Sequence, residues 1–504
     1  MSKTVNIGSR LELLVDDHLI ERMEGVRLKL HRPVRREVAF TTDAPWEGNA
    51  CNYVSVFRDG PICRMYYHGM HYRHSGPPAQ ALEPHPPFLC YAESEDGIHW
   101  RRPELGIFEF EGSKANNIVL TPEAVAEVEG DPAHTAVFLD TNPDCSPDER
   151  YKMVMLGRKP RGLYALKSAD GIRFSLMSRE PIVTEGAFDS QNLAFWDPVR
   201  CEYREYHRGF RDGVRDIMTS TSKDFLHFPK PRWLEYPGAP REHLYTNQIQ
   251  PYYRAPHIFV GFPARYTERE WSEPLLALPG LEERLARARA HPRYGSAITD
   301  ALFMTSRDGV TFRRWPEAFI RPGPRLRGSW VYGDNYVFWG MIETMSSLED
   351  APNEISLYAT EGYWEGTSVD FRRYTLRVDG FVSATAPLSG GEVLTKPLVF
   401  EGGNLTLNFE TSGAGSIRVE IQDADGDPID GYTLADCPPI FGDSLRYTVR
   451  WRTRGGDVRP LSGRPVRLRF VLEDADLYAF QFVPYEPDPE RPDLVELGIL
   501  RDRP

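Results

Sequence analysis

Cys90-Tyr-Ala-Glu-Ser94-Glu-Asp96-Gly97-Ile-His-Trp100 is the stretch that decides the fold, because the same phrase recurs along the chain. In each copy an apolar extended segment leads to a hydroxyl residue, a turn that usually reads Asp-Gly, an apolar residue and an aromatic. Further copies stand at residues 166–174, 222–228 and 304–312, and a degraded one at 358–364. Copies separated by 54 to 84 residues (Ser94, Ser168, Ser222, Ser306 and Thr360) are typical of propeller blades with insertions. Five copies therefore predict five blades.

Each copy has the form of a β-hairpin, in which Gly tolerates the positive φ of the turn. A second recurrent phrase precedes it, as in Asn52-Tyr-Val-Ser-Val-Phe57 and Asn335-Tyr-Val-Phe338-Trp. A third strand follows in most units, for example Tyr151-Lys-Met-Val-Met-Leu156. With a fourth strand in the connecting segments, each unit predicts a four-stranded antiparallel blade.

The chain changes character beyond the propeller pattern. Short alternating strands at 405–409, 416–421, 447–451, 466–471 and 477–482 predict an antiparallel β-sandwich. We therefore expect an all-β protein with a five-bladed propeller over residues 1–385, a sandwich over 386–485 and a surface tail over 486–504. The N-terminal strand near residues 11–15 is expected to help close the propeller ring.

One helix is predicted in this otherwise β chain, at Gly280-Leu-Glu-Glu-Arg-Leu-Ala-Arg-Ala-Arg-Ala290. We expect a solvated insertion that packs Leu281 and Leu285 against the propeller rim, with a lid or an oligomer contact as the alternative. In the sandwich, Asp423-Ala-Asp425-Gly-Asp427 is similar to the start of a calcium loop, but Leu434 stands where such a loop needs its Glu. A hairpin turn is favoured there, a structural calcium is the alternative, and no other cofactor is expected.

Composition limits the partners. A formal net charge of −13 and a pI near 5.6 argue against nucleic acid and anionic membrane surfaces, and neutral ligands fit better. The six cysteines have no zinc-like spacing, which favours a reducing compartment. No apolar leader or membrane-length run is present, so the chain as given is expected to be cytoplasmic, or secreted if a signal peptide has been removed. The oligomeric state is left open.

The repeated phrase, the opening Leu13-Leu-Val-Asp-Asp17-His-Leu-Ile20 and the stretch 90–100 resemble the five-bladed propeller glycoside hydrolases around families 32, 43 and 68. The C-terminal sandwich strengthens the resemblance, because family 32 enzymes carry one as well. The resemblance implies a pocket at the propeller axis, with carboxylates from inner strands of different blades. The family 32 nucleophile motif with Asp-Pro corresponds here to Pro45-Trp46-Glu47-Gly48-Asn49, which lacks it; Arg215-Asp216-Ile217 only faintly matches the Arg-Asp-Pro motif, and the Glu-Cys acid motif is absent.

The site residues therefore have to be predicted from blade geometry, because no role can be transferred position by position. Pocket side chains come from the starts of inner strands and the ends of second strands, and polar groups there need partners. These positions are, blade by blade, Glu47, Asn49, Asn52, His68 and His71; Asp131, His134 and Arg158; Asp189, Gln191, Asn192, His207, Arg208 and Arg211; His243, Tyr245, Asn247 and Arg265; and Trp330, Tyr332, Asp334, Asn335 and Glu343.

Glycoside cleavage uses two carboxyls, separated by roughly 5 Å for retention or 6.5–9.5 Å for inversion. We expect Asp189 to be one of them, because it starts the most polar inner strand, with Glu47, Asp334 or Glu343 as its partner. Each of these could instead hold a strand end or pair with an arginine. Aromatic Trp46, Trp330 and Tyr332 suit stacking on sugar rings and equally suit propeller packing.

The predicted function is an exo-acting glycosidase for a neutral oligosaccharide or furanoside. Two alternatives remain open. The first is a glycoside phosphorylase, whose phosphate the pocket histidines and arginines Arg158, Arg208, Arg211 and Arg265 would hold. The second is a carbohydrate-binding propeller without catalysis, which would lack a carboxyl pair at hydrolytic spacing. Phosphate dependence of activity separates phosphorylase from hydrolase.

Overall fold

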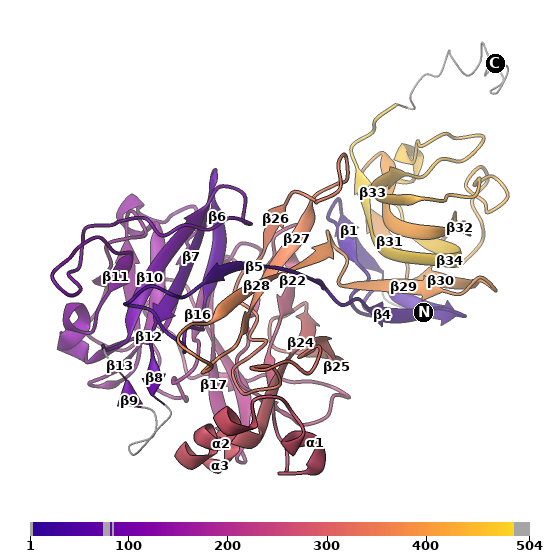
Figure 1. Cartoon of the computed structure of the whole chain (residues 1–504). Coiled ribbons are helices and arrows are strands. Elements are labelled where there is room, and N and C mark those ends of the chain that lie inside the picture. The colour runs from indigo at the N-terminus through magenta and orange to yellow at the C-terminus, as the bar shows by residue number, and fades with distance from the viewer. Residues whose placement is uncertain (1–3, 74–80, 83–84, 488–504) are drawn as a thin grey trace. The chain divides into compact units, whose positions relative to one another are not determined.

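The computed structural model describes residues 4–73, 81–82 and 85–487, and its chain divides into two compact units (Figure 1). One unit is Arg32–Val378 and the other joins Met1–His31 to Asp379–Pro504. The first 31 residues thus belong with the C-terminal part, and not with the propeller as the sequence suggested.

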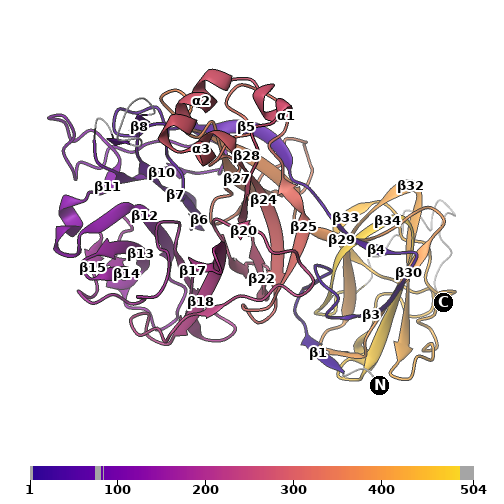
Figure 2. The ribbon, with the colours of Figure 1, turned by 90° about the horizontal axis from the view of Figure 1, so that it is seen from below.

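The unit Arg32–Val378 is a five-bladed β-propeller, as predicted, with its five sheets arranged around a common axis (Figure 2). We number the blades 1 to 5 along the chain. The strands run, from the innermost outward, β6 (Ser55–Asp59), β7 (Ile62–Gly69), β10 (Phe88–Ser94) and β11 (Ile118–Leu120) in blade 1; β12 (Gly130–Leu139), β13 (Tyr151–Arg158), β14 (Arg161–Ser168) and β15 (Ser175–Leu176) in blade 2; and β16 (Leu193–Asp197), β17 (Glu202–Arg211), β18 (Val214–Ser222) and β19 (Arg232–Trp233) in blade 3.

Blades 4 and 5 depart from this simple pattern. The strands are β20 (His243–Leu244), β21 (Gln250–Tyr252), β22 (Ala255–Gly261), β23 (Ala264–Glu268), β24 (Ala297–Ser306) and β25 (Phe312–Ile320) in blade 4, and β26 (Ile342–Thr344), β27 (Glu354–Glu361), β28 (Asp370–Arg377) and β5 (Val34–Thr41) in blade 5. The smaller elements of this unit are β8 (Tyr72–Arg73), β9 (Ala81–Leu82) and the 3₁₀ turns η1 (Glu123–Val128) and η2 (Pro147–Glu149).

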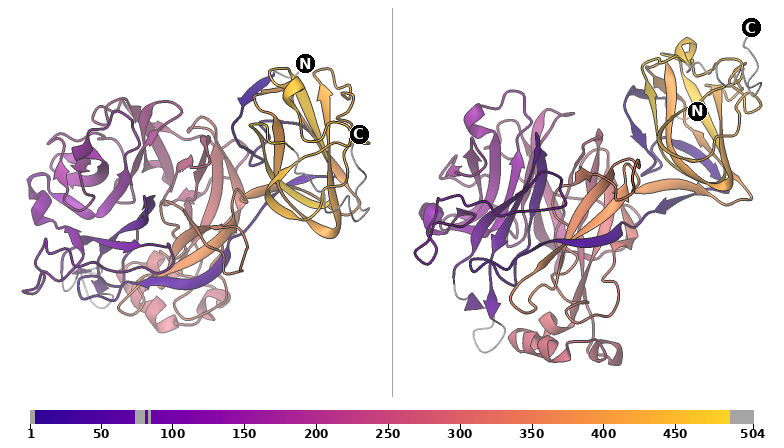
Figure 3. Two further views of the ribbon diagram at one scale, coloured as in Figure 1. Left: turned by 90° about the horizontal axis from the view of Figure 1, so that it is seen from above. Right: turned by 45° about the horizontal axis from the view of Figure 1, so that its top comes forward.

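The ring is closed by β5, which forms the outermost strand of blade 5 and pairs Phe40 with Phe371 of β28 (Figure 3). Residues 11–15 do not close it, which corrects the expectation from the sequence. Glu12–Leu13 (β2) pairs with β34 (Val466–Val483) in the other unit. The error arose because pairing partners far along the chain are not visible in the local sequence pattern.

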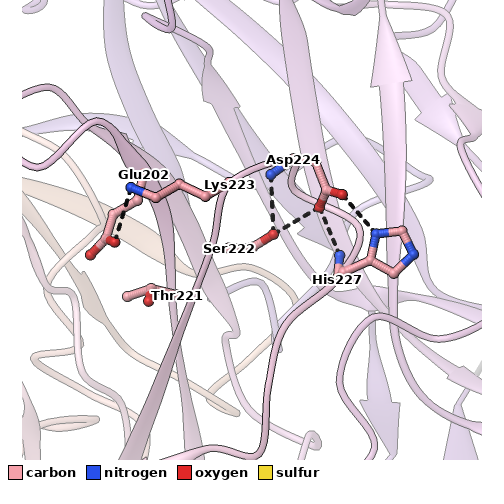
Figure 4. Close-up of a pocket in the computed structure, with 6 residues that line it drawn as sticks. All are labelled: Glu202, Thr221, Ser222, Lys223, Asp224 and His227. Carbon is pink, nitrogen blue, oxygen red and sulfur yellow. Dashed lines mark hydrogen bonds and ion pairs between the residues drawn. The ribbon is translucent and has the colours of Figure 1, made fainter.

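The Ser-x-Asp turn of the repeated phrase has the same hydrogen bonds in four blades. In blade 3, Ser222 Oγ donates to Asp224 Oδ1 (2.9 Å), and Asp224 accepts from the backbone of His227 (2.9 Å) and contacts its Nδ1 (2.7 Å) (Figure 4). The same Ser–Asp bond recurs at Ser94, Ser168 and Ser306. The Asp side chain therefore satisfies backbone donors that the turn leaves free.

The glycine of the turn explains why the phrase is tied to the blade interface. At Gly171, φ is +76°, and its carbonyl accepts a hydrogen bond (2.8 Å) from the buried Tyr66 hydroxyl of blade 1. Tyr206 reaches Gly309 in the same way from blade 3 to blade 4, at 2.7 Å. A side chain at Gly171 would lie 2.7 Å from the Tyr66 hydroxyl, so only glycine fits this approach.

The fifth copy of the phrase is wrong in register, although the number of blades is right. Residues 358–364 span the end of β27, the second strand of blade 5, and the start of its connection to β28, whereas the other copies span the end of a third strand. The fourth strand of blade 5 comes from β5, so the chain has no third-to-fourth turn there to encode.

The helical insertion lies between β23 and β24 and comprises α1 (Glu273–Leu276), α2 (Leu281–Ala290) and α3 (Pro292–Ser296). The helix α2 is confirmed, but its buried side is not apolar: Arg284 and Arg287 are buried, and Leu285 is 43% exposed. Arg284 donates to the carbonyls of Gly295 and Trp330 (both 2.9 Å), which makes burial of a guanidinium affordable.

The second unit is a β-sandwich with β1 (Val5–Gly8), β2, β3 (Ile20–Glu24), β4 (Arg27–Leu30), β29 (Val382–Ala386), β30 (Gly391–Thr395), β31 (Leu398–Phe400), β32 (Asn404–Asp423), β33 (Asp443–Thr448), the 3₁₀ turn η3 (Arg459–Leu461) and β34. Its pairing is antiparallel except between β1 and β31. Asp423 Oδ1 accepts the backbone N–H groups of Asp425, Gly426 and Asp427 (2.9, 3.0 and 3.0 Å), as in a turn. The predicted tail lies outside the described residues from 488 onward.

Candidate active site

Five tyrosines from three blades form a connected group at the pocket face, which we call the axial tyrosine cluster: Tyr53, Tyr245, Tyr332, Tyr336 and Tyr363. Four precede inner strands and Tyr363 follows a second strand, the positions where blade geometry predicts pocket residues. Tyr336 has ring centroids 6.2 Å from Tyr53 and 5.6 Å from Tyr245, and Tyr332 lies 5.5 Å from Tyr245 and 6.0 Å from Tyr363. Burial raises the pKa of Tyr332 and Tyr336, so their hydroxyls stay neutral hydrogen-bonding groups.

Asp189 is presented beside this cluster by a buried arginine. Arg208 Nη2 lies 2.5 Å from Asp189 Oδ1, and its guanidinium lies 4.9 Å from the centroid of the Tyr245 ring. Desolvation acts to raise the pKa of Asp189, but the charges of Arg208 and then His134 outweigh it, and the net pKa is lowered. Asp189 is therefore an ionised carboxylate at neutral pH.

His134 is held by a second carboxylate. Its Nδ1 lies 3.0 Å from Asp131 Oδ2, which also accepts from Arg158 (2.6 Å). Desolvation opposes ionisation of Asp131, but His134 and Arg158 lower its pKa well below its usual range. The His134 ring lies 5.7 Å from Tyr53, and among the described residues no hydrogen bond reaches its Nε2. Asp131 thus orients a histidine whose other nitrogen is free for a ligand.

Buried polar atoms without partners lie before inner strands and near the end of β17. Within the described part of the chain they are Asn52 Oδ1, Gln191 Nε2, Asn192 Oδ1, Arg208 Nε and Nη1, and the Tyr336 hydroxyl. An unmet buried polar group costs about 1–3 kcal/mol, so water or a ligand is expected to satisfy these atoms. They come from blades 1, 3 and 5, beside the axial tyrosine cluster.

Glu47 is placed in a structural ion pair. Its carboxylate accepts two hydrogen bonds from Arg102 (both 2.8 Å), one from the Ala44 backbone (3.0 Å) and one from the Tyr67 hydroxyl. The side chain is fully buried. Because both of its oxygens already accept hydrogen bonds, Glu47 joins the connection between β5 and β6 to Arg102 of blade 1. It has no oxygen left for a substrate.

Asp334 is buried behind the cluster. Its Oδ1 accepts the backbone N–H of Tyr363 (2.9 Å), and burial raises its pKa well above the usual range. Asp334 also borders a hollow of about 160 Å³ that Arg35, Glu361 and others line. Burial thus favours the protonated form of the Asp334 carboxyl, which has no contact with Asp189 among the described residues.

Glu343 lies toward the other end of blade 5. It is opposite Ile355 on β27, whereas Asn335 bonds to Thr360, five residues further along that strand. At about 3.4 Å per residue, the positions of Ile355 and Thr360 along β27, and hence the positions of Glu343 and Asn335 beside them, are about 17 Å apart. Glu343 instead accepts a hydrogen bond from Tyr253. Asp189 and Glu343 are therefore not brought together.

The other predicted binding residues divide into those at the axis and those used in structure. The first group belongs to the axial tyrosine cluster, contacts it or carries the unpartnered polar atoms: His134, Gln191, Asn192, Arg208, Tyr245, Tyr332 and Asn52. The structural contacts are Trp46 to Asn117, Asn49 to Tyr72 and Gly366, Asn247 to Tyr206, Arg211 to Asp216, Arg265 to Asp300 and Glu242, and Trp330 to Gly323, while Arg158 holds Asp131 and His71 lies half-buried beside Gly48.

Sequence reasoning missed Tyr53, Tyr336 and Tyr363, and the guanidinium groups of Arg215 and Arg293. A signal for the first two was present, because Asn-Tyr-Val occurs at both 52–54 and 335–337, at the start of two inner strands. Arg293 comes from the helical insertion, whose place over the site no repeat encodes.

No metal centre is evident: among the described residues, no three His, Cys, Asp or Glu side chains are grouped to hold an ion. A surface hollow of about 320 Å³ lies instead at the blade 3 turn and is lined by the six residues labelled in Figure 4. That hollow surrounds the structural Ser-x-Asp turn and lacks the axial aromatics. In the part of the chain that the structure describes, no helix is long and apolar enough to cross a membrane.

No family model matches the sequence, and no curated protein is similar to it. Solved structures that are similar include a glycosyl hydrolase from Bacteroides ovatus (13% identity, 68% of this chain and 93% of that chain, TM-score 0.39). Another is from the GH130 family of mannoside phosphorylases, which contains glycoside hydrolases that target β-1,2-mannosidic linkages in Candida mannan (12%, 72% and 96%, 0.37). A third is a fructofuranosidase from Schwanniomyces occidentalis in complex with fructosylnystose (12%, 90% and 96%, 0.35). Identities and TM-scores this low support no argument about chemistry. The chemistry therefore has to be inferred from the site itself.

Proposed function

We propose that this protein is a glycosidase that acts at the propeller axis. The observation that carries the proposal is Asp189: an ionised carboxylate, oriented by buried Arg208 and bordered by tyrosine rings and unmet hydrogen-bonding atoms. An ionised carboxylate stabilises an oxocarbenium-like transition state, either as the nucleophile or as the base for water. Aromatic faces and amides around it suit the apolar and hydroxyl sides of a sugar ring.

The proton for the leaving oxygen has to come from a second group. Neither Glu47 nor Glu343 is placed for this, Asp334 is buried with its Oδ1 already accepting the Tyr363 N–H, and Asp131 is held ionised. His134 supports the role best, because Asp131 fixes its Nδ1 side and leaves Nε2 without a partner. Histidine is an effective general acid near neutral pH. The expected carboxyl pair is thus replaced in our proposal by Asp189 and the Asp131–His134 dyad.

An exo mode of action is supported by the helical insertion. Tyr294 of α3 stacks on Tyr332 (5.7 Å, 24°) and contacts Trp364 (5.1 Å), so the insertion packs against one side of the cluster. A site bordered in this way favours the end of a sugar chain over its middle.

The test is a screen of chromogenic glycosides, furanosides included, each assayed with and without inorganic phosphate. Hydrolysis of a glycoside without phosphate supports the proposal. A strict requirement for phosphate would identify a phosphorylase instead, a function favoured by the unpaired Nε and Nη1 of Arg208. Saturable sugar binding with no turnover in either condition would identify a binding propeller.

A further inference from the structure

Three arginines surround the tyrosines at one side of the site. Arg208 and Arg215 have their guanidinium carbons 4.9 and 5.3 Å from the Tyr245 centroid, and Arg215 is also 4.7 Å from Tyr266. Arg293, from the helical insertion, lies 5.9 Å from both Tyr266 and Tyr332. Tyr245, Tyr266 and Tyr332 contact one another, with centroids 5.5 to 6.0 Å apart.

The strand register places Arg208 and Arg215 on one face of the same hairpin. Arg208 is opposite Ile217 and Phe210 is opposite Arg215, so the two arginines are diagonal neighbours across β17 and β18. Both guanidinium groups lie within 5.6 Å of the Phe210 ring. Like charges so close repel one another unless an anion lies between or beside them.

The carboxylates of this region are too few for the cations. Arg208 pairs with Asp189. Glu268 accepts a hydrogen bond (2.8 Å) from the Tyr266 hydroxyl, and it is linked to Arg293 only through that hydroxyl. Within the described residues, neither Arg215 nor Arg293 forms an ion pair with a carboxylate. Three guanidinium groups against two carboxylates leave one positive charge.

Unmet donors point to the same conclusion. Arg208 is 3% exposed, yet its Nε and Nη1 have no partner, and the Nε of Arg215 is also buried without one. His243, which accepts the Arg215 backbone N–H at 3.1 Å, has its pKa lowered by burial and then by the charge of Arg215, so it adds no anion or cation near neutral pH. Guanidinium donors of this kind match a carboxylate in a bidentate manner.

We infer that the sugar bound beside Asp189 carries a carboxylate, as a uronic acid does, and that Arg215 and Arg293, with the unpartnered Nη1 of Arg208, receive it. This inference rests on the proposed function and refines its substrate class. A carboxylate supplies an anion that the guanidinium groups of Arg215 and Arg293 lack within the described residues. The negative net charge of the whole chain led us to expect a neutral sugar. The positive charges at the site itself favour an acidic sugar.

The test is isothermal titration of the full chain with glucuronate and galacturonate, with glucose and galactose as the matched neutral sugars and with inorganic phosphate. We expect at least one uronate to bind ten times more tightly than its neutral counterpart. Arg215→Gln and Arg293→Gln should each weaken uronate binding about tenfold, roughly the loss of one charge-assisted contact. Arg232→Gln, at an exposed residue of β19, is the matched control and should bind as the wild type does.

Neutral sugars that bind as tightly as uronates, or no binding of any acid, would overturn the inference. Binding of phosphate without binding of uronate would overturn it as well and would identify a phosphate subsite. Rates on a nitrophenyl uronide and on the neutral nitrophenyl glycoside keep the two proposals apart. Turnover of the neutral glycoside alone contradicts only the acidic substrate, whereas Arg215-dependent uronate binding without any hydrolysis contradicts only the glycosidase.

Discussion

Asp189 and Arg208 form an ion pair of unequal members: the arginine side chain is 3% exposed, whereas the carboxylate bonded to it at 2.5 Å is 67% exposed. A buried cation thus holds an accessible anion in one orientation. Such a carboxylate is ready to act on a ligand without first being deprotonated, which is what the proposed chemistry needs.

Replacement of Arg208 by Lys should shift the pH dependence of activity. Because the charge and hydrogen bond of Arg208 lower the pKa of Asp189, their weakening should raise it, and the acid limb of kcat/KM should move to higher pH. Loss of orientation should also reduce kcat by about 10²-fold. Arg232→Lys, at an exposed residue of β19, is the control. An unmoved acid limb would show that Asp189 does not govern it.

Glu47→Gln should reduce stability and not chemistry. The variant leaves Arg102 without its buried partner, which costs about 3 kcal/mol in the free energy of unfolding, measured by denaturant titration. Asp43→Asn removes the other, 67% exposed partner of the same arginine and should cost less than about 0.5 kcal/mol. A stable Glu47→Gln protein with activity lost would restore Glu47 as a catalytic candidate.

Gly171→Ala should be more damaging than Gly112→Ala. Both glycines have positive φ, +76° and +80°, so the left-handed backbone destabilises both variants by about 1–2 kcal/mol. Only at Gly171 would the new methyl lie 2.7 Å from the Tyr66 hydroxyl, whereas Gly112 has open space. The extra cost should be at least about 1 kcal/mol in thermal or denaturant unfolding. Equal losses would mean that the Tyr–Gly contact does not constrain the blade interface.

The fold was largely predictable because the decisive signal is local and repeated. The turn at Ser94–Gly97 is closed by hydrogen bonds of its own side chains. Each of the four copies in register therefore indicates one blade. Closure by β5 was not predictable in the same way. It depends on pairing between residues more than 300 positions apart, such as Phe40 and Phe371, which no local pattern reports.

The site was predictable only as a set of positions. Strand starts predicted Asp189, His134 and Tyr245 as pocket residues, and this stays a prediction. Sequence cannot tell a free carboxylate from one already occupied, as Glu47 is by Arg102. It also cannot place an insertion, so the contribution of Arg293 came only with the structure.

His68 should make the propeller less stable in acid. Its neutral ring joins two blades, with Nδ1 donating to the Ala133 carbonyl (2.7 Å) and Nε2 accepting from the Asn52 N–H (2.8 Å). Burial lowers the pKa of His68 to about 4 from 6.5. Between these values the unfolded chain binds more protons, so the free energy of unfolding should fall as pH falls through this window, by about 3 kcal/mol in all.

Denaturant titrations from pH 7 to pH 4 check this expectation. His68→Gln should have lower stability at pH 7 and a shallower loss toward pH 4 than the wild type. His99→Gln, at an exposed histidine of the blade 1 turn, is the control for a histidine outside the interface. The same slope in His68→Gln and wild type would assign the acid sensitivity elsewhere.

The central claim is that Asp189 performs the chemistry, and the most direct measurement is the initial rate of Asp189→Asn on a nitrophenyl glycoside that the wild type hydrolyses. The substitution keeps the shape and removes the charge, so kcat should fall by about 10²–10⁴-fold while the unfolding transition stays in place. Asp212→Asn, at an exposed aspartate of the adjacent hairpin tip, should retain wild-type turnover. Wild-type turnover by Asp189→Asn would contradict the account.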